Sequence, residues 1–441
     1  MNRLRVTLTL KTALCAVGLC SFFAAVAQNS PALPLSTQAF RRPNGSSYAL
    51  SMTSDSRYVL IRSEASNLVP GDTNGVADLF LVDTTLRSVE LVTRRQRGVA
   101  NGATLRGMIS DTGAVIIETS ATNLSLGITD ANGVPDILYR EPNGAWRYLS
   151  IDSAGNPVGG RDPHITPDGK WCAWVQGDQA WIYNTEAGDK FRLPTPAIMG
   201  GTVRSGSLRI RGISANGRYL LFSADVEISQ QDWSRRMIWY DRDPDANGVY
   251  DDVLGAGRVL ISLPSGTNRV PSIEGVMSFD GHTVAATITG TPSLQVFHMP
   301  SGRTSSLNTG VSHSLAFALN KDGRYIAYLY MTTQQIGEIR LWDTLLGTSQ
   351  VVSIDAFGRQ RLVTAPTSLI VSNTGTQIAF SASDGNPSNP WIPGDTNQFD
   401  DVFLRVIDEG KTIGLTVGPG TLNNEAAGSV HTNRDGSITN R

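Results

Sequence analysis

The chain has 441 residues, and its 37 lysine and arginine residues against 39 aspartate and glutamate residues give a formal net charge of −2. This balance argues against a nucleic-acid-binding protein with a basic face, and a charged fraction of only 17% argues against an acidic disordered chain. The 44 glycines, together with many serine, threonine, asparagine and aspartate residues, instead indicate numerous turns between short strands.

Residues 1–27 have the pattern of a secretory signal peptide. Arg3, Arg5 and Lys11 precede a run of apolar and small residues that ends in Ala25-Val26-Ala27, a sequence that a signal peptidase accepts. The run is shorter than the roughly 20 apolar residues that a membrane-spanning helix needs. We therefore expect an exported protein, periplasmic or extracellular, with no integral membrane segment.

Cleavage after Ala27 would remove two of the three cysteines and leave Cys172 alone. The exported chain then has no internal disulfide and depends on its own core for stability. Because Cys172 stands between Trp171 and Trp174 in an apolar stretch, we expect a small buried hydrophobic residue rather than a nucleophile.

A turn close to Ser-x-Asp-Gly-Arg-Tyr, followed by an apolar strand, recurs along the rest of the chain. It lies at residues 54–58, 111–113, 166–171, 214–219, 278–281, 320–325 and 373–375. In the first unit the strands after the turn are expected at 58–62, 78–83 and 89–92, and similar strands are expected at 326–330, 339–343, 350–353 and 377–381. Four short strands in each unit of roughly 40 to 60 residues predict an all-β fold, a β-propeller of seven four-stranded blades. A β-sandwich gives no reason for seven similar units.

The tail of the chain leaves the number of blades open. Residues 428–437 copy the start of a blade, so the tail is either a partial repeat or a closing strand, and eight blades are the alternative. The expected domains are a signal peptide at 1–27, an N-terminal leader at 28–45, the propeller at 46–421 and the C-terminal segment at 422–441.

The repeat resembles that of TolB-like bacterial propellers, which carry the WD40-like PD40 repeat. Residues 65–80 of the first unit are especially similar to the calcium-loop variety found in secreted bacterial proteins. The resemblance implies the propeller fold for nearly the whole exported chain. It implies no single activity, because propellers of this type serve as binding platforms and as non-catalytic parts of peptidases.

Four loops carry two acids and an amide at the same spacing, and the units that contain them are longer than the others. We expect them between the second and third strands of their blades, with calcium as the cofactor. Alternating oxygen ligands on a tight loop suit this ion, and the Asp241 loop, the richest, resembles the calcium loops of integrin-type propellers. The alternative to calcium binding is that the same residues form ordinary turns, closed by side-chain to backbone hydrogen bonds. The candidate ligands are Asp72, Asn74 and Asp78; Asp130, Asn132 and Asp136; Asp241, Asp243, Asp245, Asn247 and Asp251; and Asp395, Asn397 and Asp401.

Arginines are frequent in the links that lead from one blade to the next. In a four-stranded meander these links share a rim with the loops between second and third strands, so arginines and calcium would lie on one face. Guanidinium groups there could bind carboxylate, phosphate or sulfate, whereas the alternative is that they are solvated or pair with nearby aspartates. The candidate ligand-binding residues are Arg94, Arg95, Arg97, Arg161, Arg204, Arg269, Arg359 and Arg361, with Arg106, Arg209 and Arg211 in the same links.

No sequence motif of a hydrolase or a zinc site is complete, and the five histidines are scattered. We therefore expect a non-catalytic, calcium-stabilised binding or scaffold module, a monomer with a protein or glycan partner and no nucleic acid. The alternative is a propeller enzyme, a lyase or hydrolase of acidic polysaccharide, with its site at the mouth of the central channel. Trp391, in a polar loop, is a candidate for an exposed contact residue.

Overall fold

The computed structural model describes residues 42–86, 88–95, 98–229, 232–253, 255, 257–264, 272–299, 301–310, 316–333, 336–364, 368–383, 388–417, 430–432 and 438–440. The predicted signal peptide, most of the leader, Arg97 and Arg269 lie outside these residues. The described residues all belong to one compact unit, Gln38–Arg441. None of the helices in the described part of the chain is long and apolar enough to cross a membrane.

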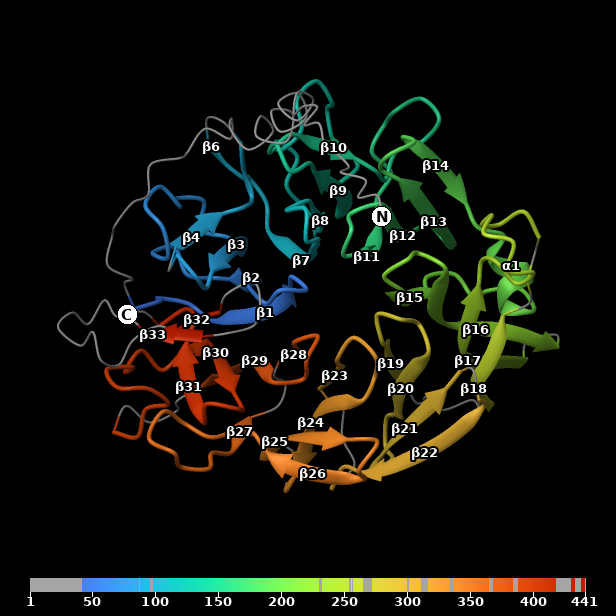
Figure 1. Cartoon of the computed structure of the whole chain (residues 1–441). Coiled ribbons are helices and arrows are strands. Elements are labelled where there is room, and N and C mark those ends of the chain that lie inside the picture. Colours follow the sequence, from blue (N-terminus) through green and yellow to red (C-terminus); the bar gives the residue numbers. More distant parts are fainter. Residues whose placement is uncertain are drawn as a thin grey trace, which may run out of the picture. The chain divides into compact units, whose positions relative to one another are not determined.

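Seven antiparallel sheets of four consecutive strands form the blades of a β-propeller (Figure 1). The innermost strands, which contact one another around the ring, are β1 (Ser47–Met52), β7 (Thr104–Ile109), β11 (Arg161–Ile165), β15 (Arg209–Ile213), β19 (Ile273–Met277), β23 (Phe317–Leu319) and β28 (Leu369–Val371). The second strands are β2 (Tyr58–Ser63), β8 (Val115–Thr119), β12 (Trp171–Gln176), β16 (Tyr219–Ser229), β20 (Thr283–Ile288), β24 (Tyr325–Met331) and β29 (Gln377–Ser383). The third strands are β3 (Asp78–Asp83), β9 (Asp136–Arg140), β13 (Gln179–Asn184), β17 (Asp232–Asp241), β21 (Ser293–His298), β25 (Ile336–Asp343) and β30 (Asp400–Val406). The outer strands are β4 (Ser88–Leu91), β10 (Trp146–Tyr148), β14 (Asp189–Arg192), β18 (Arg258–Pro264), β22 (Arg303–Asn308), β26 (Thr348–Val351) and β31 (Lys411–Gly414).

The remaining elements lie in the links and the tail. A hairpin of β5 (Arg94–Arg95) and β6 (Gly98–Val99) follows blade one, the short helix α1 (Thr195–Met199) follows blade three, and β27 (Val363–Thr364) pairs with β25. In the tail, β32 (Val430–Thr432) and β33 (Ile438–Asn440) form a two-stranded sheet of their own. The prediction of seven blades is confirmed, and the described part of the tail forms no strand of a blade.

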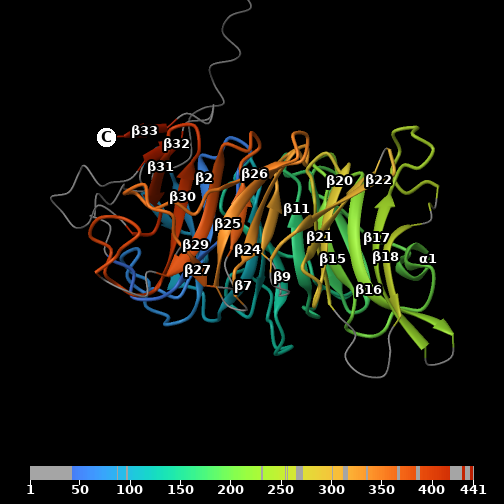
Figure 2. The same cartoon turned by 90° about the horizontal axis from the view of Figure 1, so that it is seen from below.

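The up-and-down order of the strands divides the connections between two rims of the ring (Figure 2). We call the rim with the turns between first and second strands, and between third and fourth strands, the turn rim. The opposite rim, with the loops between second and third strands and the links to the next blade, is the link rim. β16 and β17 are the longest strands, and their hairpin projects at the link rim (Figure 2).

The glycine of the repeated turn is required for two reasons. Gly217 and Gly281 have φ of 77° and 78°, a left-handed conformation that side chains other than glycine rarely adopt. A Cβ at Gly217 would also lie 2.3 Å from Cδ1 of Trp171, and one at Gly281 would lie 2.2 Å from Cδ2 of Tyr219. The turn of each of these blades therefore packs on the aromatic residue that follows the turn of the preceding blade.

The arginine of the repeated turn has a structural role. In blade four, Nε and Nη2 of Arg218 donate to the two carboxylate oxygens of Asp241 at 2.7 and 2.8 Å, and the guanidinium carbon lies 5.1 Å from the centre of the Tyr219 ring. Equivalent pairs join Arg57 to Asp83 and Arg324 to Asp343. This explains why Arg-Tyr recurs after the turn, with an aspartate at the end of the third strand.

The core lies between neighbouring sheets and includes two residues singled out above. Cys172 is fully buried, as expected, and burial raises its thiol pKa. Trp391 is also fully buried, so the prediction of an exposed contact residue is wrong. Its ring packs 5.3 Å from the ring centre of Phe403 and 5.4 Å from that of Phe380, because the polar loop folds back over the core of blade seven.

Blades one and seven meet without sharing a strand. The hydroxyl of Tyr48 donates to Asp400 at 3.0 Å, and the amide of Ala49 donates to the hydroxyl of Ser368 at 3.0 Å. On the turn rim, Nδ2 of Asn373 donates to the carbonyl oxygen of Ser54 at 3.1 Å. The ring therefore closes through packing and hydrogen bonds between residues more than 300 positions apart.

Candidate functional site

Three of the four acidic loops lie between second and third strands, on the link rim, as predicted. Each ends in a fully buried aspartate near the start of the third strand, at Asp78, Asp136 and Asp401. A hydroxyl from the following link binds each carboxylate: Thr93 donates to Asp78 at 2.5 Å, Ser150 to Asp136 at 2.6 Å and Thr416 to Asp401 at 2.8 Å. The same hydroxyls accept the backbone N–H of the next residue, at Leu79, Ile137 and Val402. We call this arrangement the hydroxyl latch.

The asparagine of each loop closes the turn. Nδ2 donates to the buried aspartate over 2.6 Å from Asn74, 2.7 Å from Asn132 and 2.9 Å from Asn397. Each Oδ1 accepts the backbone N–H two residues later. Gln398 replaces the glycine of the third loop and keeps its left-handed conformation, with φ of 67°. The hydrogen-bonded turn that the sequence offered as the alternative is therefore present.

The first loop contains a buried oxygen that a cation would suit. Asp72 is 6% exposed, and its Oδ1 accepts no hydrogen bond within the described residues. Burial, followed by the negative charge of Asp78, raises the pKa of Asp72 to about 6. Two buried carboxylates close enough to repel each other, with a neighbouring amide, are oxygen ligands of the kind that calcium binds.

The fourth loop, at Asp241–Asp251, is not where we predicted it. It connects β17 to β18, the third and fourth strands of blade four, and so lies on the turn rim. The prediction was wrong because the long β16–β17 hairpin places the loop one connection later than in the other blades.

Arginines neutralise several carboxylates of this fourth loop. Arg218 pairs with Asp241 and, at 3.5 Å, with Asp243, while Arg242 donates two hydrogen bonds to Asp251 at 2.6 and 2.9 Å. Arg242 is fully buried and lies 4.5 Å from the ring centre of Trp171. Across the described residues, no group of three or more His, Cys, Asp or Glu side chains is arranged to hold a metal ion.

The predicted ligand-binding arginines fall into two groups. Those at the ends of the chain have structural partners: Arg359 and Arg361 both pair with Asp355, and Arg95 donates to the carbonyl oxygen of Asn123. Arg94 contributes its carbonyl oxygen to the indole N–H of Trp146. The arginines of blades two to four lie near one another: Arg106 and Arg209 both pair with Asp162, and Arg161 pairs with Asp178 at 3.8 Å.

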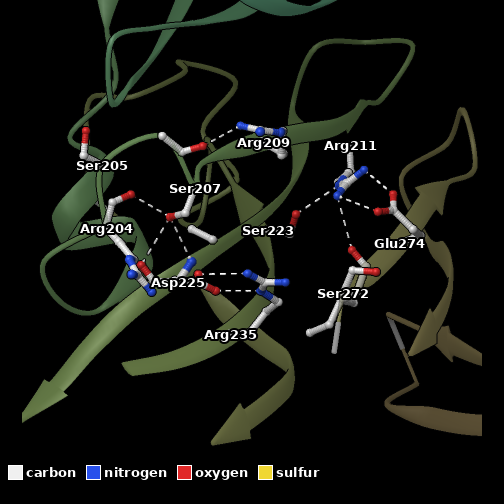
Figure 3. A pocket seen from close by; sticks show the side chains of 13 residues that line it. Arg204, Ser205, Ser207, Arg209, Arg211, Ser223, Asp225, Arg235, Ser272 and Glu274 are labelled. Carbon is white, nitrogen blue, oxygen red and sulfur yellow. Dashed lines mark hydrogen bonds and ion pairs between the residues drawn. The ribbon is translucent and has the colours of Figure 1, made fainter. Parts of the chain in front are cut away.

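A cavity of about 370 Å³ opens at the link rim of blade four, between the start of β15 and the start of β19 (Figure 3). Arg204, Arg209 and Arg211 contribute to its lining, as do side chains from the second and third strands of the same blade. The charged lining residues are Arg204, Arg209, Arg211, Arg235, Asp225 and Glu274, and the serines are Ser205, Ser207, Ser223 and Ser272.

Both carboxylates of this pocket are paired. Nε and Nη2 of Arg235 donate to the two oxygens of Asp225 at 2.6 and 2.8 Å, and Arg211 forms a two-point pair with Glu274. Nη1 of Arg209 donates to two backbone carbonyls, at 2.7 and 2.9 Å. With four guanidinium groups and two carboxylates, the pocket lining carries a charge of +2.

A second charged cluster lies beside this pocket, where the inner strands of blades two and three meet. Asp162, almost fully buried, pairs with Arg106 at 3.2 Å and with Arg209 at 3.7 Å, and its backbone N–H donates to Glu118 at 3.1 Å. Its φ of 55° is unusual for a residue other than glycine. Such strained conformations concentrate at functional sites.

His164 belongs to this cluster. Its Nδ1–H donates to the carbonyl oxygen of Asp162 at 3.1 Å, which leaves Nε2 as the acceptor of the neutral ring. Burial lowers the pKa of His164, and the charges of Arg106 and Arg211 lower it further. Burial raises the pKa of Glu118. The cluster therefore combines a neutral imidazole, a carboxyl group that binds its proton more tightly than usual and arginines.

Five charged residues of these two clusters were not predicted from the sequence: Glu118, Asp162, Asp225, Arg235 and Glu274. Their signal was weak: Asp162 and Glu274 are the second residues of inner strands, Glu118 and Asp225 lie in second strands and Arg235 lies in a third strand, and no local motif connects these positions. Only the ring brings these positions together.

Comparison of the sequence with protein-family models and with curated proteins gives no match. Solved structures are similar in fold. A puromycin hydrolase structure is 14% identical, with a TM-score of 0.50, over 86% of this chain and 54% of that one. A structure from a study of two prolyl endopeptidases is 12% identical, with a TM-score of 0.50, over 85% of this chain and 50% of that one.

TolB from Acinetobacter baumannii is also among the similar structures, at 13% identity and a TM-score of 0.37, over 76% of this chain and 75% of that one. This chain spans about half the length of the puromycin hydrolase and prolyl endopeptidase chains. At these identities the likeness concerns the fold: the chain is a seven-bladed β-propeller, and TolB is among the propeller proteins similar to it.

Proposed function

We propose that the protein is an exported, calcium-stabilised binding module that holds an anionic partner on its link rim. The observation that carries this proposal is the arginine-lined pocket of blade four, whose lining has a charge of +2 although both of its carboxylates are already paired. Guanidinium groups bind carboxylate and phosphate in a two-point geometry, and they keep their charge at any physiological pH.

Calcium would stabilise the same rim through the three loops between second and third strands. Asp72, Asn74 and Asp78 would hold the ion in the first loop, with Asp130, Asn132, Asp136, Asp395, Asn397 and Asp401 at the equivalent positions. The ion would supply positive charge to buried carboxylates. It would compete there with the asparagine Nδ2, so the amide would have to turn its oxygen to the ion. We favour these loops over the Asp241 loop, because Arg218 and Arg242 already neutralise that loop.

Thermal unfolding of the exported chain tests the calcium proposal. We expect millimolar calcium to raise the midpoint, a chelator to reverse the rise and Asp72→Asn to reduce it. Asp152→Asn is the control, since Asp152 caps a similar but exposed turn. An unchanged midpoint with calcium and chelator would reject the proposal.

Binding of labelled polymers tests the partner proposal. We expect the exported chain to bind an anionic polymer such as dextran sulfate, not to bind uncharged dextran, and to lose affinity as salt increases. Arg204→Glu with Arg209→Glu should abolish binding, whereas Arg359→Glu, on the same rim but outside the pocket, should not. Equal binding of both polymers would contradict the proposal.

The cluster around Asp162 favours an enzyme as the second candidate function, with acidic polysaccharide as the substrate. In a lyase reaction, Arg106 would hold the carboxylate of the sugar, and Nε2 of His164 would take the proton from the neighbouring carbon. The electron pair of that bond would form a double bond as the glycosidic oxygen leaves with a proton from Glu118.

An assay for unsaturated or reducing ends, with polygalacturonate as substrate, tests this second function. Activity that His164→Ala and Glu118→Gln abolish and that His282→Ala retains would support it. His282 is a suitable control because it lies on the turn rim, away from the cluster. No product at high enzyme concentration would reject the lyase.

A further inference from the structure

We infer that the pocket of blade four binds a hexuronate unit of an acidic oligosaccharide. This rests on the proposed function and names its ligand. Two of the four guanidinium groups are committed to carboxylates inside the pocket, in the Arg211–Glu274 and Arg235–Asp225 pairs (Figure 3). The ligand carboxylate therefore meets Arg204 and Arg209.

Arg204 and Arg209 differ in their surroundings from Arg211 and Arg235, which are paired with carboxylates. Arg204 is exposed, and among the described residues its guanidinium group forms no hydrogen bond or ion pair and lies over the ring of Trp233, with its carbon 5.7 Å from the ring centre. Arg209 has Nη1 fixed by two backbone carbonyls and Nε 3.7 Å from Asp162, and no contact of its Nη2 is found in the described part of the chain. Both groups thus keep N–H donors for which the described residues supply no acceptor.

The segment that carries Arg204 is held in place before any ligand binds. The backbone N–H of Arg204 donates to the carbonyl oxygen of Asp225 at 2.8 Å, and the backbone N–H of Asp225 donates to the hydroxyl of Ser207 at 3.1 Å. The backbone N–H of Gly206 donates to Asp178 at 2.6 Å. Ordering of this segment therefore adds little to the entropic cost of binding.

The lining favours a sugar over an acidic peptide. Four serines stand beside the charged groups, and Ala224 and Ile273 are the two apolar residues that line the cavity. Hydroxyls, carbonyls and guanidinium groups match the hydroxyls and carboxylate of a uronate. A bound peptide would instead require apolar pockets for alternate side chains. The volume of about 370 Å³ lies within the range of small-ligand pockets.

Isothermal titration of the exported chain tests the inference, with a galacturonate trimer, its methyl ester and hexaglutamate as probes. We expect the trimer to bind, and the ester, which lacks the charge, to bind at least about tenfold more weakly. The double variant Arg204→Gln with Arg209→Gln should bind the trimer more weakly than the wild type does, by a similar factor. Arg359→Gln removes the same charge from an arginine paired with Asp355 outside the pocket and should leave binding unchanged.

Each other outcome overturns the inference in a distinct way. If hexaglutamate binds and the trimer does not, the ligand is a peptide, and the proposed binding of an anionic partner survives. If the trimer and its ester bind with equal affinity, the arginines do not recognise the carboxylate. If no probe binds, or if the double variant binds the trimer as the wild type does while remaining folded by circular dichroism, the pocket is not the site.

Discussion

At the scale of single residues, arginine has three different roles in this protein. It joins strands as a partner of aspartate, as in the Arg57–Asp83 pair, it neutralises the loop of blade four from a buried position at Arg242, and it lines an open pocket at Arg204. Exposure and partners distinguish these roles. The sequence contains no sign of the difference, since the neighbours of Arg204 and Arg359 in the chain are equally polar.

The buried pair of Arg242 and Asp251 should be far more costly to break than a surface pair. Arg242→Ala leaves Asp251 without its two hydrogen bonds, and loss of one partner of a buried pair typically costs about 3–5 kcal/mol. Arg324→Ala, in the more exposed Arg324–Asp343 pair, should reduce the free energy of unfolding much less, because solvent screens that pair. Urea unfolding measures the free energy of unfolding of both variants. Equal losses in the two variants would contradict a larger contribution from the Arg242–Asp251 pair.

Lys190 should give stability an unusual dependence on pH. Burial lowers its pKa to about 8, while the nearby charge of Asp152 acts in the opposite direction. In the unfolded chain a lysine has a pKa of about 10.4, so between about pH 8 and pH 10 the unfolded state binds more protons. The contribution of Lys190 to the unfolding free energy therefore rises with pH in this window.

Comparison of the wild type with Lys190→Met isolates this effect. The unfolding free energy of the wild type minus that of the variant should increase between about pH 8 and pH 10. Lys170→Met is the control, because the Glu186 partner raises the pKa of Lys170 and leaves it charged throughout the window. A flat difference for Lys190 would show that its hydrogen bonds and the ring of Trp181 retain the proton.

At the scale of elements, local sequence patterns predicted most of the strands. They failed where the length of a strand or hairpin differs between blades. The third strand of blade one, at 78–83, is as expected, because apolar alternation and two flanking aspartates define it. The outer strands expected at 89–92 and 350–353 lie at 88–91 and 348–351, since edge strands have weaker patterns. The Asp241 loop was misplaced because nothing in the sequence of β16 and β17 marks where their long hairpin turns.

The hydroxyl latch gives a prediction at this scale from two matched serines. Ser150 binds both the buried carboxylate of Asp136 and the backbone N–H of Ile137, whereas Ser353, at the equivalent position of blade six, accepts the backbone N–H of Ile339. With a chelator present, Ser150→Ala should cost about 2–3 kcal/mol and Ser353→Ala about 1 kcal/mol. If both variants lose a similar amount of unfolding free energy, the hydrogen bond from Ser150 to the buried carboxylate of Asp136 does not contribute to stability.

At the scale of the whole molecule, seven similar units predict a ring, but they do not predict how it closes. Strand pairing confines the blades to residues 47–414, and the described hairpin of the tail pairs with itself. The pocket of blade four draws residues from two links and from strands of blades four and five, and Asp162 pairs with arginines from the blades on either side. Such sites depend on the ring and leave no local motif.

Removal of residues 422–441 should therefore leave the propeller intact. We expect the shortened chain to unfold in one transition, with a midpoint within about 2 °C of the full chain, because a loss of 1 kcal/mol would shift it by only a few degrees. Scanning calorimetry measures the midpoint. Loss of the cooperative transition would show that the tail closes the ring.

Arginine footprinting measures whether the arginines of the blade-four pocket bind an anionic partner. The exported chain is treated with a dicarbonyl reagent, with and without an acidic ligand, and modification of each arginine is measured by mass spectrometry. We expect Arg204 and Arg209 to react in the free protein and to be protected by the ligand, while the reactivity of Arg359 is unchanged. Protection of Arg359 alone, or of no arginine at a ligand concentration that saturates binding, would contradict it.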